Sequence, residues 1–536
     1  MVKYMQNAEQ LKYGKIGTII PIVKTIDKAV NSVEFFSKIS DYGRKKNSLL
    51  FESADIAEKY GELSIGTSEP CLRVAGRGAE FEILALNLQG VKIIEFLKKG
   101  LNFCDKVIYK KDIISGILNP ERKSVSEEQR LKLRTHIDII RKIAFLFKPT
   151  SKPFIPYCGM FGIFSYDFIE QFEDLPKNKE DPLNEPDYEF YFVDNLFISD
   201  HKNNKTHFVA NAIITDNKKD AIYNRCVGII RKYESFLNKN LPKSKKFKTL
   251  NQVISNDTGK KEYEAIVAKL KKNILYGDIF QVVPSRTITT NYNAEPLDIY
   301  NTLRKLNPSP YMFYINTKEG ILLGSSPEMA LCVQGDVDKV VTIRPIAGTK
   351  PRGYIGDNID ADLDSKYEVE LKIDEKELAE HSMLVDLARN DIAKISKAGT
   401  RFVDKAFFVA KYSHVQHLVS NVRGVLREDL DCLHAYLAVM NMGTLTGAPK
   451  VMAMRILREN EVTKRGFYGG CVCYITPSND FDSTIIIRSI RIKQDLAYIR
   501  AGGGIVYDSI PKNEFLETER KAQACLKAIK MAGGLR

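Results

Sequence analysis

The chain has 536 residues, of which 44% are hydrophobic and 27% charged, and its formal net charge is +13. This length exceeds what one hydrophobic core usually supports, so we expect two large lobes of a globular protein rather than a disordered or fibrous chain. The excess charge is Lys spread along the whole chain, without a long basic tract. That distribution argues against nucleic-acid binding. The positive charge is consistent with attraction of a small anionic substrate.

The nine cysteines are odd in number and lack paired spacing, which predicts reduced thiols and a cytoplasmic setting. Cys471 and Cys473 have no second Cys pair or His cluster beside them, so we expect no zinc site. The N-terminus has no apolar signal-peptide core, and no apolar run reaches the length of a membrane span. The sequence therefore predicts no membrane association.

The first half of the chain mixes short strands with helices. Residues 1–47 indicate a polar lead-in with one or two helices, and the alternation with glycines in residues 71–88 predicts a hairpin. The other expected strands are residues 48–54, 159–166, 188–198 and 207–214, the last two as an antiparallel pair. The other expected helices are residues 91–99, 125–147 and 219–237.

The polar stretch 238–258 predicts a linker between an N-terminal lobe, residues 1–245, and a second domain, residues 258–533. Asp257 or Thr258 suits the N-cap of the helix that follows. The expected strands of the second domain are residues 278–289, 311–316, 321–324, 329–334, 338–344, 467–476, 484–493 and 496–501. Its expected helices are residues 262–275, 296–305, 368–388, 429–440, 448–458 and 512–531. Because the strands are hairpin-like, we expect an α+β fold, a large two-lobed sandwich of antiparallel sheets packed with helices.

The stretch from Asp374 to Asp391 predicts a helix with an acidic face. Asp374, Glu377 and Glu380 are three residues apart, so neighbouring carboxylates lie side by side on the helix surface. Like charges this close repel one another. The face is consistent with a solvated surface or with a divalent cation site, since such cations take carboxylate oxygens.

A second acidic helix favours the cation site. Glu514, Glu517 and Lys521 share one face of a helix that Pro511 is placed to start. The sequence Arg500-Ala-Gly-Gly-Gly-Ile-Val506 precedes it, and three glycines at the end of a strand expose N–H groups that can hold an anion. Two acidic faces beside a glycine cradle predict Mg²⁺ between the protein and a carboxylate- or phosphate-bearing substrate.

Other polar groups are available to the same anion. Arg488 follows an apolar strand and is equally consistent with a carboxylate ligand or an ordinary strand-edge arginine. The loops 344–353 and 443–450 offer hydroxyl and backbone donors. His414 and His417 are three residues apart without a third metal ligand nearby, which favours one catalytic and one structural histidine over a metal pair.

Five of these stretches together resemble the chorismate-utilising enzymes: 344–353, 377–391, 443–450, 501–509 and 514–521. The resemblance extends over about residues 45–530. Enzymes of this family bind chorismate, a cyclic dicarboxylate, with Mg²⁺ on its ring carboxylate. The resemblance implies Glu380 and Glu517 as the principal metal ligands, with Glu377 and Glu514 supporting them directly or through water.

The same resemblance implies roles for further residues. Glu328 matches the general acid for the departing 4-hydroxyl, His417 matches the histidine of the later pyruvate elimination, and Lys521 lies nearby as a third catalytic candidate. The implied substrate contacts are Gly348, Thr349, Thr446, Tyr468, Arg488, Gly502, Gly503 and Gly504.

Two positions distinguish the branches of the family. Branches that add water carry Lys where Gln281 stands, and a neutral amide cannot activate water as a base. Aminodeoxychorismate synthases, the alternative within the enzyme class, typically carry a nucleophilic Lys where Ala347 lies. Direct attack by ammonia remains. It points to the anthranilate synthase branch, which makes anthranilate and pyruvate through aminodeoxyisochorismate in the first step of tryptophan biosynthesis.

The resemblance also implies regulation and a partner. Residues 49–53 and 307–314 resemble the two halves of a tryptophan feedback pocket, although both stretches are also consistent with ordinary ends of core strands. The implied tryptophan contacts are Ser53, Pro310, Tyr311 and Met312. The chain lacks a Gly-x-Cys-x-Gly elbow, so ammonia is expected from a separate glutamine amidotransferase small subunit, component II, in a heterodimer or heterotetramer. A catalytically silent tryptophan sensor is the alternative from another class. The residues that argue against it are Glu328, Glu380, His417 and Glu517.

Overall fold

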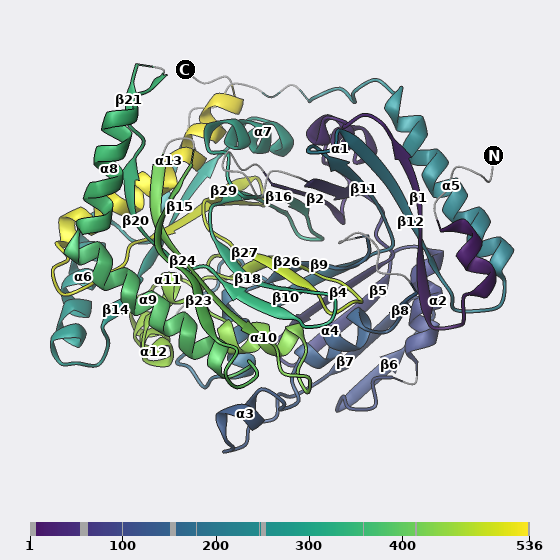
Figure 1. Ribbon diagram of the computed structural model, residues 1–536, viewed down its shortest axis with the longest axis horizontal. Coiled ribbons are helices and arrows are strands. Elements are labelled where there is room, and N and C mark those ends of the chain that lie inside the picture. Colours follow the sequence, from purple (N-terminus) through teal and green to yellow (C-terminus); the bar gives the residue numbers. More distant parts are fainter. Residues whose placement is uncertain are drawn as a thin grey trace.

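The computed structural model describes residues 7–533 apart from 54–62, 99, 151–156, 178–179, 246, 248–252, 357 and 413–414. At its centre two large sheets pack face to face, and helices cover their outer surfaces (Figure 1). Nearly all neighbouring strands in the described residues are antiparallel, with β1 and β8 as a parallel pair. The predicted α+β sandwich of antiparallel sheets is confirmed.

The two sheets contain twelve and thirteen strands within the described residues. The order in the first is β13 (Ile254–Asn256), β15 (Ser285–Asn291), β29 (Leu496–Gly502), β28 (Ser489–Lys493), β17 (Ile321–Ser326), β16 (Tyr311–Asn316), β2 (Ser48–Glu52), β3 (Leu63–Thr67), β11 (Asn195–Asp200), β12 (Lys205–Ile213), β1 (Thr18–Ile26) and β8 (Lys148–Pro149). The order in the second is β20 (Ile346–Pro351), β24 (Val415–Val425), β19 (Val340–Ile343), β18 (Met329–Gln334), β27 (Phe481–Ile485), β26 (Cys471–Ile475), β9 (Gly159–Phe164), β10 (Tyr188–Val193), β4 (Leu72–Arg77), β5 (Glu80–Ala85), β7 (Ile113–Ile117) and β6 (Lys106–Tyr109), with β23 (Phe402–Lys411) also paired to β24. Two short pairs are β14 (Gln281–Val282) with β25 (Gly447–Ala448), and β21 (Tyr354–Ile355) with β22 (Asn358–Ile359).

The described helices begin and end as follows: η2 (Ala8–Tyr13), α1 (Ser32–Ile39), α2 (Leu88–Leu97), α3 (Glu127–Arg130), α4 (Ile137–Ala144), η3 (Tyr166–Gln171), α5 (Lys219–Leu237), α6 (Lys260–Leu275), α7 (Pro296–Leu306), α8 (Ala361–Ile373), α9 (Glu375–Ala393), α10 (Cys432–Val439), α11 (Gly443–Thr446), α12 (Lys450–Asn460) and α13 (Pro511–Ala532). Helix α9 packs on β24 and β20, and α13 packs on α6, α7 and β29. These two contacts bring the acidic helices to the same end of the sandwich (Figure 1).

Both halves of the chain build both sheets. Strand β2 pairs with β16 in the first sheet, and β9 pairs with β26 in the second. Hydrogen-bonded strand pairs thus join residues 1–245 to residues 258–533 within the same sheets. The division of the chain into these two domains stays a prediction. No helix or strand is assigned between α5 and β13 among the described residues of the expected linker.

Three apolar layers hold the sandwich together. Leu322, Phe161 and Val472 belong to the core between the two sheets. A second core packs α1, α5, α7 and α13 on the outer face of the twelve-stranded sheet, and a third packs α2, α4, α9 and α10 on the other sheet. Such burial is the main source of stability in a domain of this size.

Several predicted elements are confirmed and several are wrong. The 71–88 hairpin is β4 and β5, residues 219–237 form α5, and residues 207–214 pair as β12 with β11. The lead-in 1–47 is wrong in part, because Thr18–Ile26 is the buried strand β1. Its apolar residues line both faces, so they form a continuous run instead of an alternation, and Pro21 interrupts the run.

The expected strand 188–198 divides into two strands of different sheets. The chain leaves the thirteen-stranded sheet after β10 and enters the twelve-stranded sheet at β11. Asp194 lies between them, fully buried, and accepts a hydrogen bond of 2.7 Å from Arg225. Both strands are buried, so the apolar residues of the sequence continue from one strand into the next. The sequence pattern therefore does not show where the chain passes from one sheet to the other.

Helix boundaries account for most other errors. Residues 125–147 form two short helices, α3 and α4, and residues 368–388 span the end of α8 and most of α9. Asp374 ends α8 and caps α9, accepting from the backbone N–H groups of Lys376 and Glu377. The N-cap of α6 is Gly259 rather than Asp257 or Thr258. The loop predicted at 344–353 contains strand β20, and the pair β23 and β24 was not predicted.

The nine cysteines are all free of disulfides, as predicted. Over the residues that the structure describes, no helix combines the length and the apolar character that crossing a membrane requires.

The core between the sheets should dominate stability. Leu322 is 1% exposed there, whereas Leu88, at the start of α2, is 84% exposed. Replacing Leu322 with Ala leaves a cavity and should lower the free energy of unfolding by about 2–5 kcal/mol. Replacing Leu88 with Ala should change it by less than about 0.5 kcal/mol. Unfolding midpoints in urea measure both, and equal shifts would refute this assignment of the core.

Candidate active site

The acidic face of α9 is confirmed as a partly buried surface rather than a solvated one. Burial raises the pKa of Glu377, and the neighbouring charges of Glu380, Asp374 and Glu517 raise it further. Burial is also the largest cause of the raised pKa of Glu380. Carboxyl groups of this kind resist ionisation unless a cation or a hydrogen-bond donor lies opposite.

Helix α13 brings the second carboxylate pair to the same place. Burial and the charge of Glu517 raise the pKa of Glu514, and the Ser509 hydroxyl partly offsets them. Glu514 Oε2 is buried and has no hydrogen-bond partner among the described residues. Lys521 Nζ lies 2.7 Å from Glu517 Oε1 and donates to the Gly502 carbonyl at 3.0 Å. The two acidic faces therefore meet, with one ammonium group between α13 and the end of β29.

The glycine run at 502–504 makes room for these carboxylates. A Cβ atom on Gly503 would lie 3.1 Å from Glu514 Oε2, and one on Gly504 would lie 2.7 Å from Gln281 Nε2. The Gly503 N–H donates to the Pro284 carbonyl at 3.3 Å, so it is not the open anion donor that the sequence suggested. Close approach of backbone and side chain is thus one physical reason for glycine here.

Gln281 completes this corner of the site. Its Nε2 donates to Glu380 Oε1 at 2.9 Å, and this hydrogen bond partly offsets the burial that raises the pKa of Glu380. This donation leaves Gln281 Oε1 as an acceptor, and it is buried without a partner among the described residues. A side-chain amide at this position orients a carboxylate and does not remove protons.

The chemistry of the four glutamates fits Mg²⁺ better than a softer metal. Their donors are all carboxylate oxygens, and the unpartnered Glu514 Oε2 is the kind of atom that a hard cation satisfies. Within the described residues, however, no three His, Cys, Asp or Glu side chains converge closely enough to hold a metal together. The carboxylates are neighbours rather than a formed cage, which suits an ion that keeps water and substrate oxygens in its shell.

Glu328 lies at the other side of the site, where β17 leads into β18. Burial raises the pKa of Glu328 to about 7, and the facing Thr444 hydroxyl, Lys521 and Arg488 partly offset this shift. Its carbonyl accepts hydrogen bonds from Ile485 N–H and from the Thr484 hydroxyl. These bonds fix the backbone that carries the side chain, and a buried carboxyl group that is half protonated near neutral pH is suited to donate a proton.

His417, on β24, is shifted in the opposite direction. Burial lowers its pKa to about 4, and the nearby Arg488 charge lowers it further. His417 Nδ1 lies 3.0 Å from the Gly348 carbonyl and 2.9 Å from Thr349 Oγ1. A carbonyl only accepts, so Nδ1 carries the hydrogen and Nε2 is the basic nitrogen. That Nε2 is buried and has no partner among the described residues.

The expected substrate contacts surround these groups. Arg488 adopts a left-handed backbone conformation at φ 47° and donates to Asn307 Oδ1 at 3.4 Å. Gly348 has φ 63°, and a Cβ there would lie 3.0 Å from Glu377 Oε2. Tyr468 lies at the backbone of Gly502, and burial raises its pKa to about 12. Thr446 is farther from the charges, since its hydroxyl pairs with the Tyr166 hydroxyl at 3.1 Å.

Some site residues were missed by sequence reasoning. Thr444 faces Glu328, although only Thr446 of that loop was predicted as a contact. Lys450 and Asp391 form a buried ion pair of 2.6 Å, with no role predicted for either. Asp391 lies on the same face of α9 as Glu380, and this spacing in the sequence could have predicted that it lies near the site. His414 lies outside the described residues.

The four residues expected to bind tryptophan lie together at the ends of β2 and β16, away from the glutamates. Strand β2 pairs with β16 so that Glu52 faces Met312, which places Ser53 beside Tyr311. Ser53 Oγ is buried without a partner among the described residues, and Pro310 and Met312 are buried as well. The Tyr311 hydroxyl donates to Asp482 at 3.1 Å.

Comparison with known proteins identifies the family of the chain. Residues 108–527 match the family described as chorismate binding enzyme. The chain belongs to that family.

Its relatives include proteins named anthranilate synthase component 1. The protein of that name from Buchnera aphidicola is 42% identical over 91% of this chain and 94% of its own. The one from Vibrio cholerae is 39% identical over 90% of this chain and 92% of its own. The crystal structure of anthranilate synthase component I from Streptococcus pneumoniae is 27% identical, covers 88% of this chain and 94% of that one, and superposes with a TM-score of 0.69. The menaquinone-specific isochorismate synthase of Escherichia coli shares the fold at 16% identity over 98% of this chain and 99% of that one, with a TM-score of 0.64.

The buried Glu328 should make stability depend on pH. Its pKa in the folded chain, about 7, lies above the ordinary 4.5, so its ionisation costs nothing at low pH and costs most above pH 7. Replacing Glu328 with Gln should therefore raise the free energy of unfolding at pH 8 by up to about 3 kcal/mol. Most of that gain should disappear at pH 5. Urea unfolding at both pH values measures it, with Glu459→Gln on the exposed side of α12 as the control; a gain independent of pH would contradict the assignment.

Proposed function

We propose that the chain is the large subunit of an anthranilate synthase, which converts chorismate and ammonia into anthranilate and pyruvate. The observation that carries this choice within the family is Gln281, an amide bonded to Glu380 inside the site, where water-adding branches carry a lysine. Ala347, buried in β20, likewise offers no nucleophile. The relatives named anthranilate synthase component 1 support the same choice.

The residues divide the reaction into two steps. In the first, the nitrogen of ammonia attacks ring carbon 2, the two ring double bonds shift, and the 4-hydroxyl leaves as water with the proton of Glu328. The ammonium group formed at carbon 2 then loses a proton, which restores the Glu328 carboxyl. In the second, His417 Nε2 accepts the proton of carbon 2 while the bond from the ring to the enolpyruvyl oxygen breaks, which leaves anthranilate. The departing enolate takes up one proton, which balances the one that His417 received, and becomes pyruvate. Near pH 7 Glu328 is half protonated and His417 is unprotonated, which suits one to give a proton and the other to take one.

Cationic and neutral donors hold the substrate in this proposal. Arg488 and Lys521 bind the carboxylates. The smaller contacts come from Gly348, Thr349, Thr446, Tyr468 and Gly502 to Gly504. Mg²⁺ would be held by Glu380 and Glu517, with Glu377 and Glu514 supporting, and would neutralise the ring carboxylate when bound.

A direct assay tests the function. The purified chain with chorismate, Mg²⁺ and an ammonium salt should produce anthranilate fluorescence and one pyruvate per anthranilate. Glutamine alone should give no product, because we place glutamine hydrolysis on a separate amidotransferase subunit. Isochorismate, or an aminodeoxychorismate without pyruvate release, would refute the proposal in favour of another branch.

The metal assignment has its own variant. Replacing Glu380 with Gln should lower kcat at least about 100-fold, since it removes charge from the reacting centre. In wild-type protein Mg²⁺ should also raise the melting temperature, and this shift should be lost with Glu380→Gln. Glu375→Gln, on the exposed first turn of the same helix, should retain both properties. If Mg²⁺ does not change the melting temperature of the wild type, the proposed metal site is contradicted.

We further propose that tryptophan inhibits the enzyme at the end of β2 and β16. The support is the cluster of Ser53, Pro310, Tyr311 and Met312, in which the Ser53 hydroxyl is buried and available to a ligand. We also propose a reducing, cytoplasmic setting for the protein. The nine free cysteine thiols support it.

Tryptophan should inhibit the assay above, and the inhibition should depend on Ser53. Replacing Ser53 with Ala removes one hydrogen bond to the ligand, which should raise the inhibition constant about 5–10-fold without changing kcat. Ser48→Ala, at the other end of the same strand, should leave inhibition unchanged. Activity that is unaffected by tryptophan in the wild type would refute the regulatory proposal and leave the catalytic one standing.

A further inference from the structure

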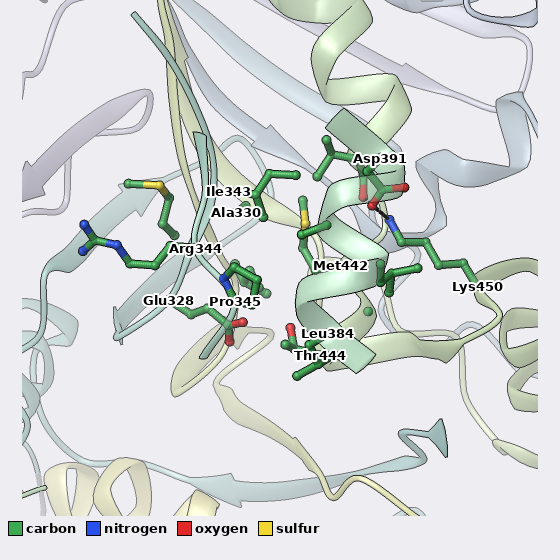
Figure 2. A pocket seen from close by; sticks show the side chains of 16 residues that line it. Glu328, Ala330, Ile343, Arg344, Pro345, Leu384, Asp391, Met442, Thr444 and Lys450 are labelled. Carbon is green, nitrogen blue, oxygen red and sulfur yellow. Dashed lines mark hydrogen bonds and ion pairs between the residues drawn. The ribbon is translucent and has the colours of Figure 1, made fainter. Parts of the chain in front are cut away.

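Two cavities meet behind the Glu328 side of the site. The inner one, about 30 Å³, is bordered by Glu328 and Thr444 (Figure 2). The outer one, about 460 Å³, lies between α3, η3, α9 and α12. Glu127, Asn390 and Val451 line the outer cavity and are exposed, so it opens to the protein surface.

The two cavities share a wall one side chain thick. Leu387, Asp391 and Lys450 line both of them. Lys450 Nζ donates to Asp391 Oδ2 and to the Val439 carbonyl, each at 2.6 Å (Figure 2). Both charged side chains are buried, so the pair forms a polar plug in an otherwise apolar partition.

Helix α9 forms one continuous side of this path. Glu380, Leu384, Leu387 and Asp391 recur on one face of the helix. From Glu380 to Asp391 the helix rises about 16 Å. The face thus runs from the predicted metal ligands, past the inner cavity, to the wall of the outer one.

The inner cavity selects by size and polarity. Its volume of about 30 Å³ exceeds the roughly 10–15 Å³ that one water-sized molecule needs, so it has room for ammonia, and it is small beside the outer cavity. Most of its lining is apolar, including Ile343, Leu384 and Met442. Its polar end is the Glu328 carboxyl, beside which the proposed reaction places the departing hydroxyl. A small neutral molecule that crosses the wall arrives at the reacting centre.

We propose that the outer cavity and the inner cavity form the entry route of ammonia, with the Lys450–Asp391 pair as its outer closure. This inference rests on the proposed function and adds a path for the second substrate. Moving the charge of NH₄⁺ out of water into this mostly apolar partition is costly, and the buried carboxylate in the wall, Asp391, is already paired with Lys450, whereas neutral NH₃ carries no such penalty. The wall therefore passes the nucleophilic form of the substrate and holds back its cationic form.

Substitutions of Leu387 test the route, because this residue stands in the shared wall and has no part in the proposed chemistry. Leu387→Phe fills the wall and should lower kcat/KM for ammonia, at saturating chorismate, about tenfold or more. The dissociation constant of chorismate should stay unchanged. Leu387→Ala widens the wall and should keep kcat/KM for ammonia at or above the wild-type value. Leu275→Phe, the same change at an exposed position of α6 outside both cavities, is the control.

The outcomes separate the route from the function. If the wild type makes no anthranilate from ammonium, the proposed function fails. If it does, but Leu387→Phe and the control share the wild-type kcat/KM for ammonia, ammonia enters elsewhere and the route is refuted. A loss that is matched by weaker chorismate binding also refutes it, since the substitution would then act by distorting the substrate site.

Discussion

The site depends on holding like charges together in a partly buried place. Helices α9 and α13 each bring two glutamates, and burial raises the pKa of Glu377, Glu380 and Glu514. The fold bears this cost by packing both helices against sheets whose strands come from both halves of the chain. Glycines at the end of β29 let the backbone approach these side chains, since a Cβ on Gly503 would crowd Glu514 at 3.1 Å and one on Gly504 would crowd Gln281 at 2.7 Å. The repulsion that remains is what a divalent cation and an anionic substrate would relieve together.

Burial acts in opposite directions on the two proposed proton carriers. A buried carboxyl favours its protonated form, and a buried imidazole favours its unprotonated form. The pKa of Glu328 is therefore raised to about 7, and the pKa of His417 is lowered to about 4. Near neutral pH Glu328 is half protonated and His417 is unprotonated. The same environment thus prepares one group to donate and the other to accept. Arg488 lies close to both and supplies the fixed positive charge of the site.

Sequence periodicity revealed the parts of the fold that are amphipathic, and missed the parts that are buried on both faces. The acidic spacing of α9 and α13 and the neighbouring glycines led to the site because each is a local pattern. Strand β1 and the crossing at Asp194 were missed, since a strand buried on both sides has no alternation to read. Gln281 Oε1 and His417 Nε2, which have no partner in the part of the chain that the structure describes, were also beyond prediction, because satisfaction of a buried group depends on neighbours that are distant in sequence.

The continuity of the sheets also decides how the expected tryptophan pocket and the Glu328 side of the active site can influence each other. Tyr311 on β16 pairs with Ser326 on β17, and the Ser326 hydroxyl accepts the N–H of Glu328 at 3.4 Å. The Tyr311 hydroxyl also reaches Asp482 on β27, the strand next to β18. A ligand that moves Tyr311 would therefore act on the backbone of Glu328 through one strand pair and on its neighbouring strand through one hydrogen bond. Coupling of this kind requires two arrangements of β16, and packed sheets favour discrete arrangements over continuous deformation.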